Sequence, residues 1–155
     1  MDDREKIAHK LALKQFALDL ISTRIEAARQ QAEQAQEAAN QEEKSSAGDK
    51  YETSRAMGHL QKDMYSRQQA EHARELAGLH QVKVDILYSS AVPGAFIQCP
   101  GISFFIAAGL GKQQIHDQTV LFLSPAAPLA KTLYQRRTGD SILFNGRSLA
   151  IQDIF

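Results

Sequence analysis

The sequence predicts an α+β protein, in which an N-terminal antiparallel coiled-coil hairpin of two helices precedes a small antiparallel β-sheet domain with one short helix. Apolar and small residues recur in steps of four and three over the first part of the chain, which is typical of a coiled coil. Short runs of β-branched and aromatic residues between prolines and glycines fill the second part. We therefore expect a helical domain over residues 1–80 and a sheet domain over 81–155.

The first helix is predicted from a heptad seam that begins at Ile7. The seam is made of Ile7, Leu11, Lys14 as an exception, Leu18, Ile21, Ile25, Ala28, Ala32, Ala35 and Ala39. Because its later members are all alanine, we expect the two helices to be closely spaced there. The return helix is expected from about Lys50, with Met57, Leu60 and Met64 on one face and Ala70, Ala73, Leu76 and Leu79 continuing that face less regularly.

The strands of the sheet domain are predicted from six apolar runs. These are residues 82–88, 95–98, 102–107, 119–123, 141–144 and 148–154. Asn145-Gly146 predicts a β-hairpin, since both residues tolerate positive φ. Residues 128–134 predict a short helix begun by Pro128, and residues 109–112 a turn.

Composition excludes several classes of protein. Lysine plus arginine and aspartate plus glutamate both number 18, so no net charge directs the chain to nucleic acid or to an anionic membrane. The single cysteine, Cys99, excludes an internal disulfide and is expected to be buried and inert. The five histidines lack metal-ligand spacing, and we find neither a signal peptide nor a spanning helix. We expect a cytoplasmic protein that does not bind membranes.

Two carboxylates lie three residues apart where the helices are expected to turn, within a tip over residues 41–53. Asp49 and Glu52 are separated by Lys50 and Tyr51. The pattern Asp-x-x-Glu at a helix start is also a capping box, in which Asp49 would cap the first turn and Glu52 would bond back to it. The sequence leaves both interpretations open.

Two segments resemble the Gre family of bacterial transcript-cleavage factors. The first segment reads Ala127-Pro128-Leu129-Ala130-Lys131-Thr132-Leu133-Tyr134-Gln135-Arg136-Arg137-Thr138-Gly139-Asp140. A strand, Asn145-Gly146 and a last strand ending in Ile-x-x-Ile follow it. In the family it reads roughly serine-proline-leucine-glycine-lysine-alanine-leucine-leucine-glycine-lysine-lysine-x-glycine-aspartate, with the same spacing. The second is the tip, where Gre factors carry Gly-Asp-Leu-Ser-Glu-Asn and this chain reads Gly48-Asp49-Lys50-Tyr51-Glu52-Thr53.

The resemblance implies a helical hairpin fused to a domain of the FK506-binding-protein type. It implies that the protein docks on RNA polymerase, that the hairpin enters the secondary channel, and that nascent RNA is contacted indirectly. Asp49 and Glu52 would assist a magnesium ion shared with the polymerase, which cuts its own backtracked RNA, so the chain would not be an enzyme alone. We assign Lys131, Arg136 and Arg137 to docking and expect a monomer with no cofactor of its own.

Other functions remain open. Tyr51 and Thr53 replace the family serine and asparagine, so a regulator or inhibitor that occupies the channel without supporting cleavage is the main alternative. The basic pair Arg136-Arg137 is also consistent with an ordinary exposed turn. A prolyl isomerase is disfavoured because the chain has no tryptophan, and a self-associating coiled-coil scaffold is the remaining hypothesis.

Overall fold

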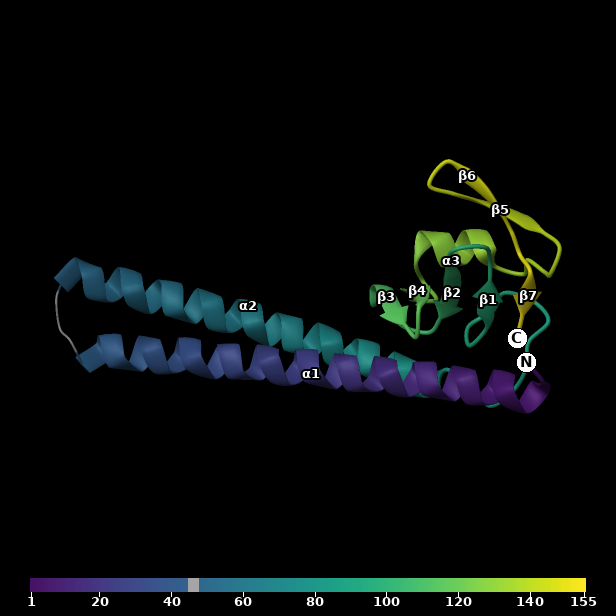
Figure 1. Ribbon diagram of the computed structural model, residues 1–155. Helices are drawn as coiled ribbons and strands as arrows, with labels where there is room; N and C mark the ends of the chain where they lie inside the picture. Colours follow the sequence, from purple (N-terminus) through teal and green to yellow (C-terminus); the bar gives the residue numbers. More distant parts are fainter. Residues whose placement is uncertain (45–47) are drawn as a thin grey trace. The chain divides into compact units, whose positions relative to one another are not determined.

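The computed structural model describes the backbone of residues 1–44 and 48–155, and the side chains of these residues except 42–44, 48–51 and 54. The chain is α+β, as predicted, with long helices first and a sheet after them (Figure 1). The helices are α1 (Asp3–Lys44), α2 (Gly48–Gln81) and α3 (Pro128–Leu133). The strands are β1 (Phe96–Gln98), β2 (Ser103–Ile106), β3 (Gly111–Ile115), β4 (Gln118–Leu123), β5 (Ser141–Phe144), β6 (Arg147–Ala150) and β7 (Asp153–Ile154).

The chain forms two compact units that do not follow the predicted boundary at residue 80. The helical unit is Asp19–Leu76, and the sheet unit is Met1–Leu18 together with Ala77–Phe155. Helix α1 therefore contributes its first turns to the sheet unit and the rest to the helical unit. The heptad pattern cannot reveal this division, because it continues through both parts of the helix.

In the helical unit, α1 and α2 run side by side (Figure 1). The predicted seam residues Ile21, Ala28, Ala35 and Ala39 are buried. A Cβ atom placed on Gly58 of α2 would lie 2.8 Å from the Cβ of Ala39, so the helices approach closely there, as the alanine run predicts.

The predicted face of α2 is right near the end of the helix, where Leu79 is buried and Leu76 half-buried, and wrong before it. Met57, Leu60 and Met64 are 59%, 69% and 45% exposed. The partly buried positions of this helix are instead Gly58, Tyr65, Gln69, His72, Glu75 and Leu76. Glycine at position 58 admits the α1 backbone where a larger side chain would hold it away, and so the packed face includes polar residues while the methionines point outward.

The sheet is mixed and not purely antiparallel. Its five strands lie in the order β3-β4-β2-β1-β7, and β5 and β6 form a separate β-hairpin. All neighbouring pairs are antiparallel except β2 and β4, which are parallel. Strand β4 returns between β3 and β2, and this insertion produces the parallel pair.

Strand β3 is not among the predicted strands. The sequence predicts a turn at residues 109–112, where this strand begins. Its sequence, Gly-Lys-Gln-Gln-Ile, is mostly polar and exposed because the strand lies at the sheet edge. A two-residue turn of His116 and Asp117, both with positive φ, joins it to β4. The predicted β-hairpin at Asn145-Gly146 is confirmed, with φ of 51° and 75° at these residues, and the predicted short helix is α3.

The predicted strand at 82–88 is also wrong, and side chains explain why. Lys14 Nζ donates to the carbonyl of Val82 at 2.8 Å, and Lys10 Nζ donates to that of Ile86 at 2.5 Å. The hydroxyl of Tyr88 donates to the carbonyl of Lys83 at 2.8 Å. Since these acceptors are occupied by side chains, the segment remains irregular while Val82 and Val84 are buried.

The two faces of the sheet are covered by different elements of the sheet unit. One face packs with α3 and the β5-β6 hairpin around a core that includes Ile97, Phe104 and Leu133. The first turns of α1 lie against the other face, where Phe16 stacks on Phe122 at 5.8 Å and His9 meets Phe96 edge-on at 4.9 Å. No described helix is long and apolar enough to cross a membrane.

Candidate functional site

The acidic pair lies at the start of α2. Helix α2 begins at Gly48, so the backbone of Asp49 is helical and Glu52 follows within the next turn. The side chain of Asp49 lies outside the described residues. Glu52 is exposed and makes no hydrogen bond or ion pair with any described residue. Among the described side chains, none competes with an external group for its carboxylate.

The helix start bears on the capping-box interpretation. A capping box needs Asp49 to stand just ahead of the helix, with non-helical backbone. Because α2 begins one residue earlier, at Gly48, Asp49 does not hold that position. Negative charge in the first turn of a helix is stabilised by the partial positive charge of its free N–H groups. Asp49, in this first turn, thus carries a charge of the sign that the helix end favours.

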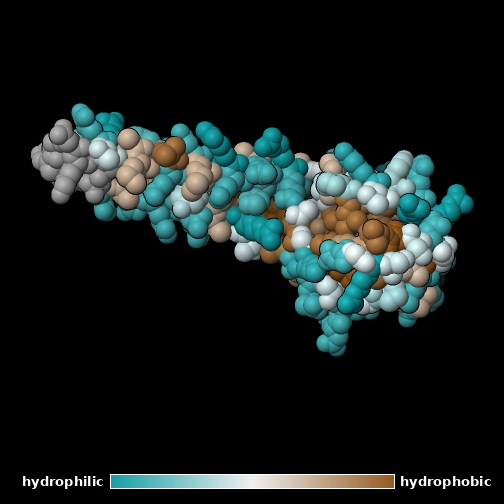
Figure 2. All heavy atoms as spheres, turned by 90° about the horizontal axis from the view of Figure 1, so that it is seen from above, coloured by the Kyte–Doolittle hydropathy of each residue, from teal (hydrophilic) through white to brown (hydrophobic). Residues whose placement is uncertain are grey.

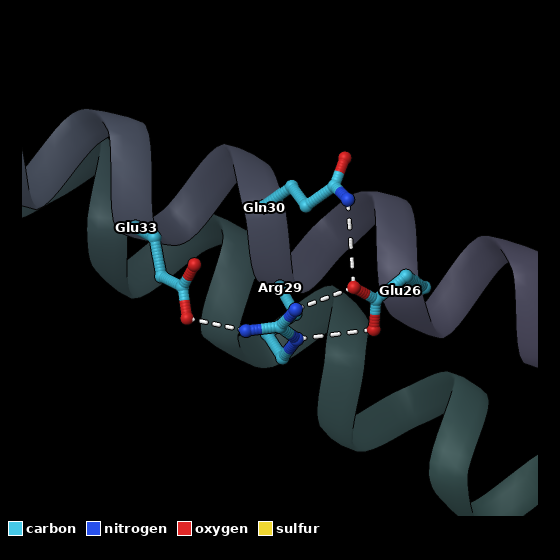
Figure 3. A network of polar contacts seen from close by, with 4 residues as sticks. All are labelled: Glu26, Arg29, Gln30 and Glu33. Atoms are coloured by element: carbon cyan, nitrogen blue, oxygen red, sulfur yellow. Dashed lines mark hydrogen bonds and ion pairs between the residues drawn. The ribbon is translucent and has the colours of Figure 1, made fainter.

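A polar network lies on α1 of the same unit (Figure 3). Arg29 donates to Glu26, three residues earlier, and to Glu33, four residues later. Gln30 donates to the same Glu26 carboxylate. The hydrogen bond from Arg29 lowers the pKa of Glu26, and the two carboxylates raise the pKa of the guanidinium. All three charges are exposed, so solvent screens the network and it contributes little to stability.

A shallow groove of about 430 Å³ runs beside this network. Its charged lining residues are Arg29, Glu33, Glu37 and Lys62. With two cations and two anions, the groove has no net preference for an anionic ligand. Lys62 of α2 lines this groove, and Arg67 and Arg74 of the same helix are exposed.

The predicted docking residues lie around α3 in the sheet unit. Lys131 belongs to α3 and, with Tyr134 and Pro125, lines an apolar hollow of about 190 Å³. Arg136 and Arg137 follow the helix, and both side chains are exposed. Their backbone is fixed: the Arg136 carbonyl accepts from the N–H of Ala91, and the Arg137 N–H donates to Asp140. Figure 2 shows an apolar area rimmed by hydrophilic residues on this unit.

The buried nucleophile and the histidines form no reactive cluster. Cys99 is buried, as predicted, and burial raises the pKa of its thiol to about 11. Burial and the charge of His116 lower the pKa of His9, which lies between Phe96 and Phe155. The described side chains contain no group of three histidine, cysteine or carboxylate residues that could hold a metal ion.

Lys10 is a residue whose role the sequence pattern did not reveal. It is fully buried, and its ammonium lies 4.7 Å from the centre of the Tyr88 ring. It donates to the carbonyls of Ile86 and, at 3.4 Å, Gly94. Burial lowers its pKa to about 8, opposed by the charge of Asp85. The sequence feature that could have indicated a buried lysine is the pair Lys10 and Lys14, which lie one turn apart within an apolar stretch of helix.

Comparisons of the chain with protein-family models, with curated proteins and with solved structures find no match. The functional interpretation therefore depends on the residues themselves.

Proposed function

We propose that this chain is a divergent Gre-like elongation factor that binds RNA polymerase, inserts its helical hairpin into the secondary channel and stimulates cleavage of backtracked RNA. The observation that carries the proposal is the position of the acidic pair. Asp49 lies in the first turn of α2 and Glu52 at the start of the next, near the N-terminus of the second long helix, and a sheet unit with the docking signature follows in the chain. The order and the spacing are those of the family.

The proposal includes the finer fold assignments. The helical unit would be an antiparallel coiled coil, which the burial of Ala28, Ala35 and Ala39 supports. The sheet unit would be a domain of the FK506-binding-protein type. One face of its sheet carries α3, and this arrangement is compatible with such a domain. We infer a cytoplasmic, monomeric protein, in which the seam residues Ile21, Ala28 and Ala35 of α1 are buried within the chain.

The residues present fit a magnesium ion shared with the polymerase. Magnesium takes oxygen ligands and is usually held by one or two carboxylates together with substrate phosphates. Glu52 offers one exposed carboxylate, and Asp49 is three residues away on the same helix. A magnesium ion held there would activate water for phosphodiester hydrolysis. The role of the chain is to deliver the two carboxylates, which lie near the N-terminus of α2.

The test is cleavage of RNA 3′ ends in purified backtracked RNA polymerase complexes with magnesium. The wild-type chain is compared with Asp49→Asn plus Glu52→Gln, which removes both charges with little change in shape. Asp63→Asn plus Glu71→Gln is a matched control, since these exposed acids lie farther along the same helix. We expect cleavage with wild type and control, and loss of cleavage in the tip variant.

Binding to polymerase separates the proposal from its alternative. If all three proteins bind and none stimulates cleavage, the chain is a channel-occupying regulator or inhibitor, consistent with Tyr51 and Thr53 at the tip. Absence of binding would overturn both. For docking, Arg136→Glu plus Arg137→Glu is expected to weaken binding in the same assay, with Lys131→Glu tested separately.

A further inference from the structure

A groove of about 560 Å³ opens in the sheet unit between the β3-β4 edge of the sheet and the β5-β6 hairpin. Its apolar lining includes the half-buried side chains of Ile102, Phe144 and Leu149. Lys112 of β3 and Arg147 of β6 also line it and are exposed. The volume lies within the usual range of ligand clefts.

The strand pairing explains how the groove arises. Lys112 lies opposite Leu121 in the antiparallel β3-β4 pair, so both side chains point to the sheet face that bears the core. Arg147 pairs with Phe144 next to the turn of the β5-β6 hairpin. Two separate sheets thus each present one cation beside an apolar surface.

The two cations are uncompensated. Neither Lys112 nor Arg147 makes an ion pair or a side-chain hydrogen bond with a described residue. The groove lining contains no carboxylate, and Asp117 lines the adjoining hollow. Thr119 and Asn145 add neutral hydrogen-bonding groups. The charge of the groove therefore complements an anionic ligand with apolar parts.

The course of the groove indicates what kind of ligand fits. Its lining crosses the sheet face from Lys112 of β3, past Thr119 of β4, to Ile102 just before β2, so the groove runs inward from the sheet edge. A groove that crosses several strands accommodates an extended segment, whose alternate side chains point to its floor. We propose that this groove binds an extended acidic peptide segment of a partner protein, with apolar side chains on Ile102, Phe144 and Leu149 and carboxylates on Lys112 and Arg147.

Nucleic acid fits the groove less well. Binding of single strands requires a track of cations and aromatic faces on which bases stack. Here two cations are present, and the Phe144 ring is already packed edge-on against Phe104 at 5.3 Å. The inference does not depend on the role of the acidic tip, so either proposal can fail without the other.

The test is fluorescence anisotropy with the full chain and a labelled ten-residue peptide of alternating glutamate and valine. We expect saturable binding in the micromolar range that weakens with added salt, as an ion-paired contact should. Binding should weaken at least about tenfold when the peptide glutamates become glutamines or when the protein carries Lys112→Glu plus Arg147→Glu. Lys83→Glu, at an exposed position outside the groove, is the matched control and should change affinity less than about twofold.

Amide chemical shifts of the labelled protein locate the site, and Gly101 and Asn145 should shift on peptide addition. Lys112→Gln plus Arg147→Gln provides a milder variant, with circular dichroism as the check on folding. The proposal is overturned by absence of saturation up to about 1 mM peptide, or by unchanged affinity in both groove variants. Tighter binding of a ten-nucleotide oligouridylate than of the peptide would also overturn it.

Discussion

Gly58 on α2 faces Ala39 on α1 so closely that a single added methyl group at position 58 would lie 2.8 Å from the alanine Cβ. Real Cβ atoms essentially never approach at this distance, so one helix must move to accept a larger residue. This contact sets the spacing of the helices near their alanine-rich ends.

Gly58→Ala is therefore expected to destabilise the helical unit even though alanine is the better helix former. Relief of the clash should cost about 1–3 kcal/mol, which exceeds the gain of about 1 kcal/mol in helix propensity. Urea unfolding followed by circular dichroism measures the difference. Gly78→Ala is the control: it lies in α2 with no atom within 4 Å of an added Cβ, and it should stabilise the protein. Equal effects of the two substitutions would contradict the close approach.

The outward face of α2 leads to a second prediction. Met57→Gln, Leu60→Gln and Met64→Gln should each change the free energy of unfolding by less than about 0.5 kcal/mol, because the side chains are exposed. Ile21→Ala, at a fully buried position of α1, should cost about 2–5 kcal/mol in the same urea titration. Large losses at the three α2 positions would mean that they face α1, as the sequence pattern predicts.

A third prediction concerns the buried lysine. Because the pKa of Lys10 falls from 10.5 to about 8 on folding, the unfolded chain binds a proton that the folded chain lacks between these values. The contribution of this group to the free energy of unfolding should therefore rise with pH across this window, by up to about 3 kcal/mol.

The measurement is urea unfolding at a series of pH values for wild type, Lys10→Met and the control Lys14→Met. The rise should disappear in Lys10→Met and persist in Lys14→Met. The informative quantity is the slope with pH, since Lys10→Met also leaves the carbonyls of Ile86 and Gly94 without a donor. An unchanged slope in Lys10→Met would assign the pH dependence to other groups.

The sequence predicts elements well where one physical signal dominates. The alanine run predicts the close helices, Pro128 predicts the start of α3, and Asn145-Gly146 predicts its β-hairpin. It fails where tertiary contacts override local preference. Residues 82–88 have strand-like composition, but their carbonyls accept from lysines of α1, which lie more than 60 residues earlier.

The packed face of α2 near Gly58 cannot be predicted from apolar character. At Gly58 it is the absence of a side chain that permits contact, and a hydrophobic periodicity does not detect it. For the candidate site, the sequence identifies Asp49, Glu52 and the basic residues after α3. The groove between Lys112 and Arg147 could not be predicted, because β3 was unrecognised and its neighbours come from distant segments.

The division of α1 between two units has a consequence for biosynthesis. The residues that cover one face of the sheet, such as His9 and Phe16, are synthesised before α2, whereas Phe155, whose ring centre lies 6.2 Å from that of His9, is synthesised after all strands of the sheet. The helical unit can form while the chain is still growing, because its residues, Asp19–Leu76, are continuous in sequence. The sheet unit can form only after Phe155 has been made, and until then the apolar side chains of early α1 lack their partners.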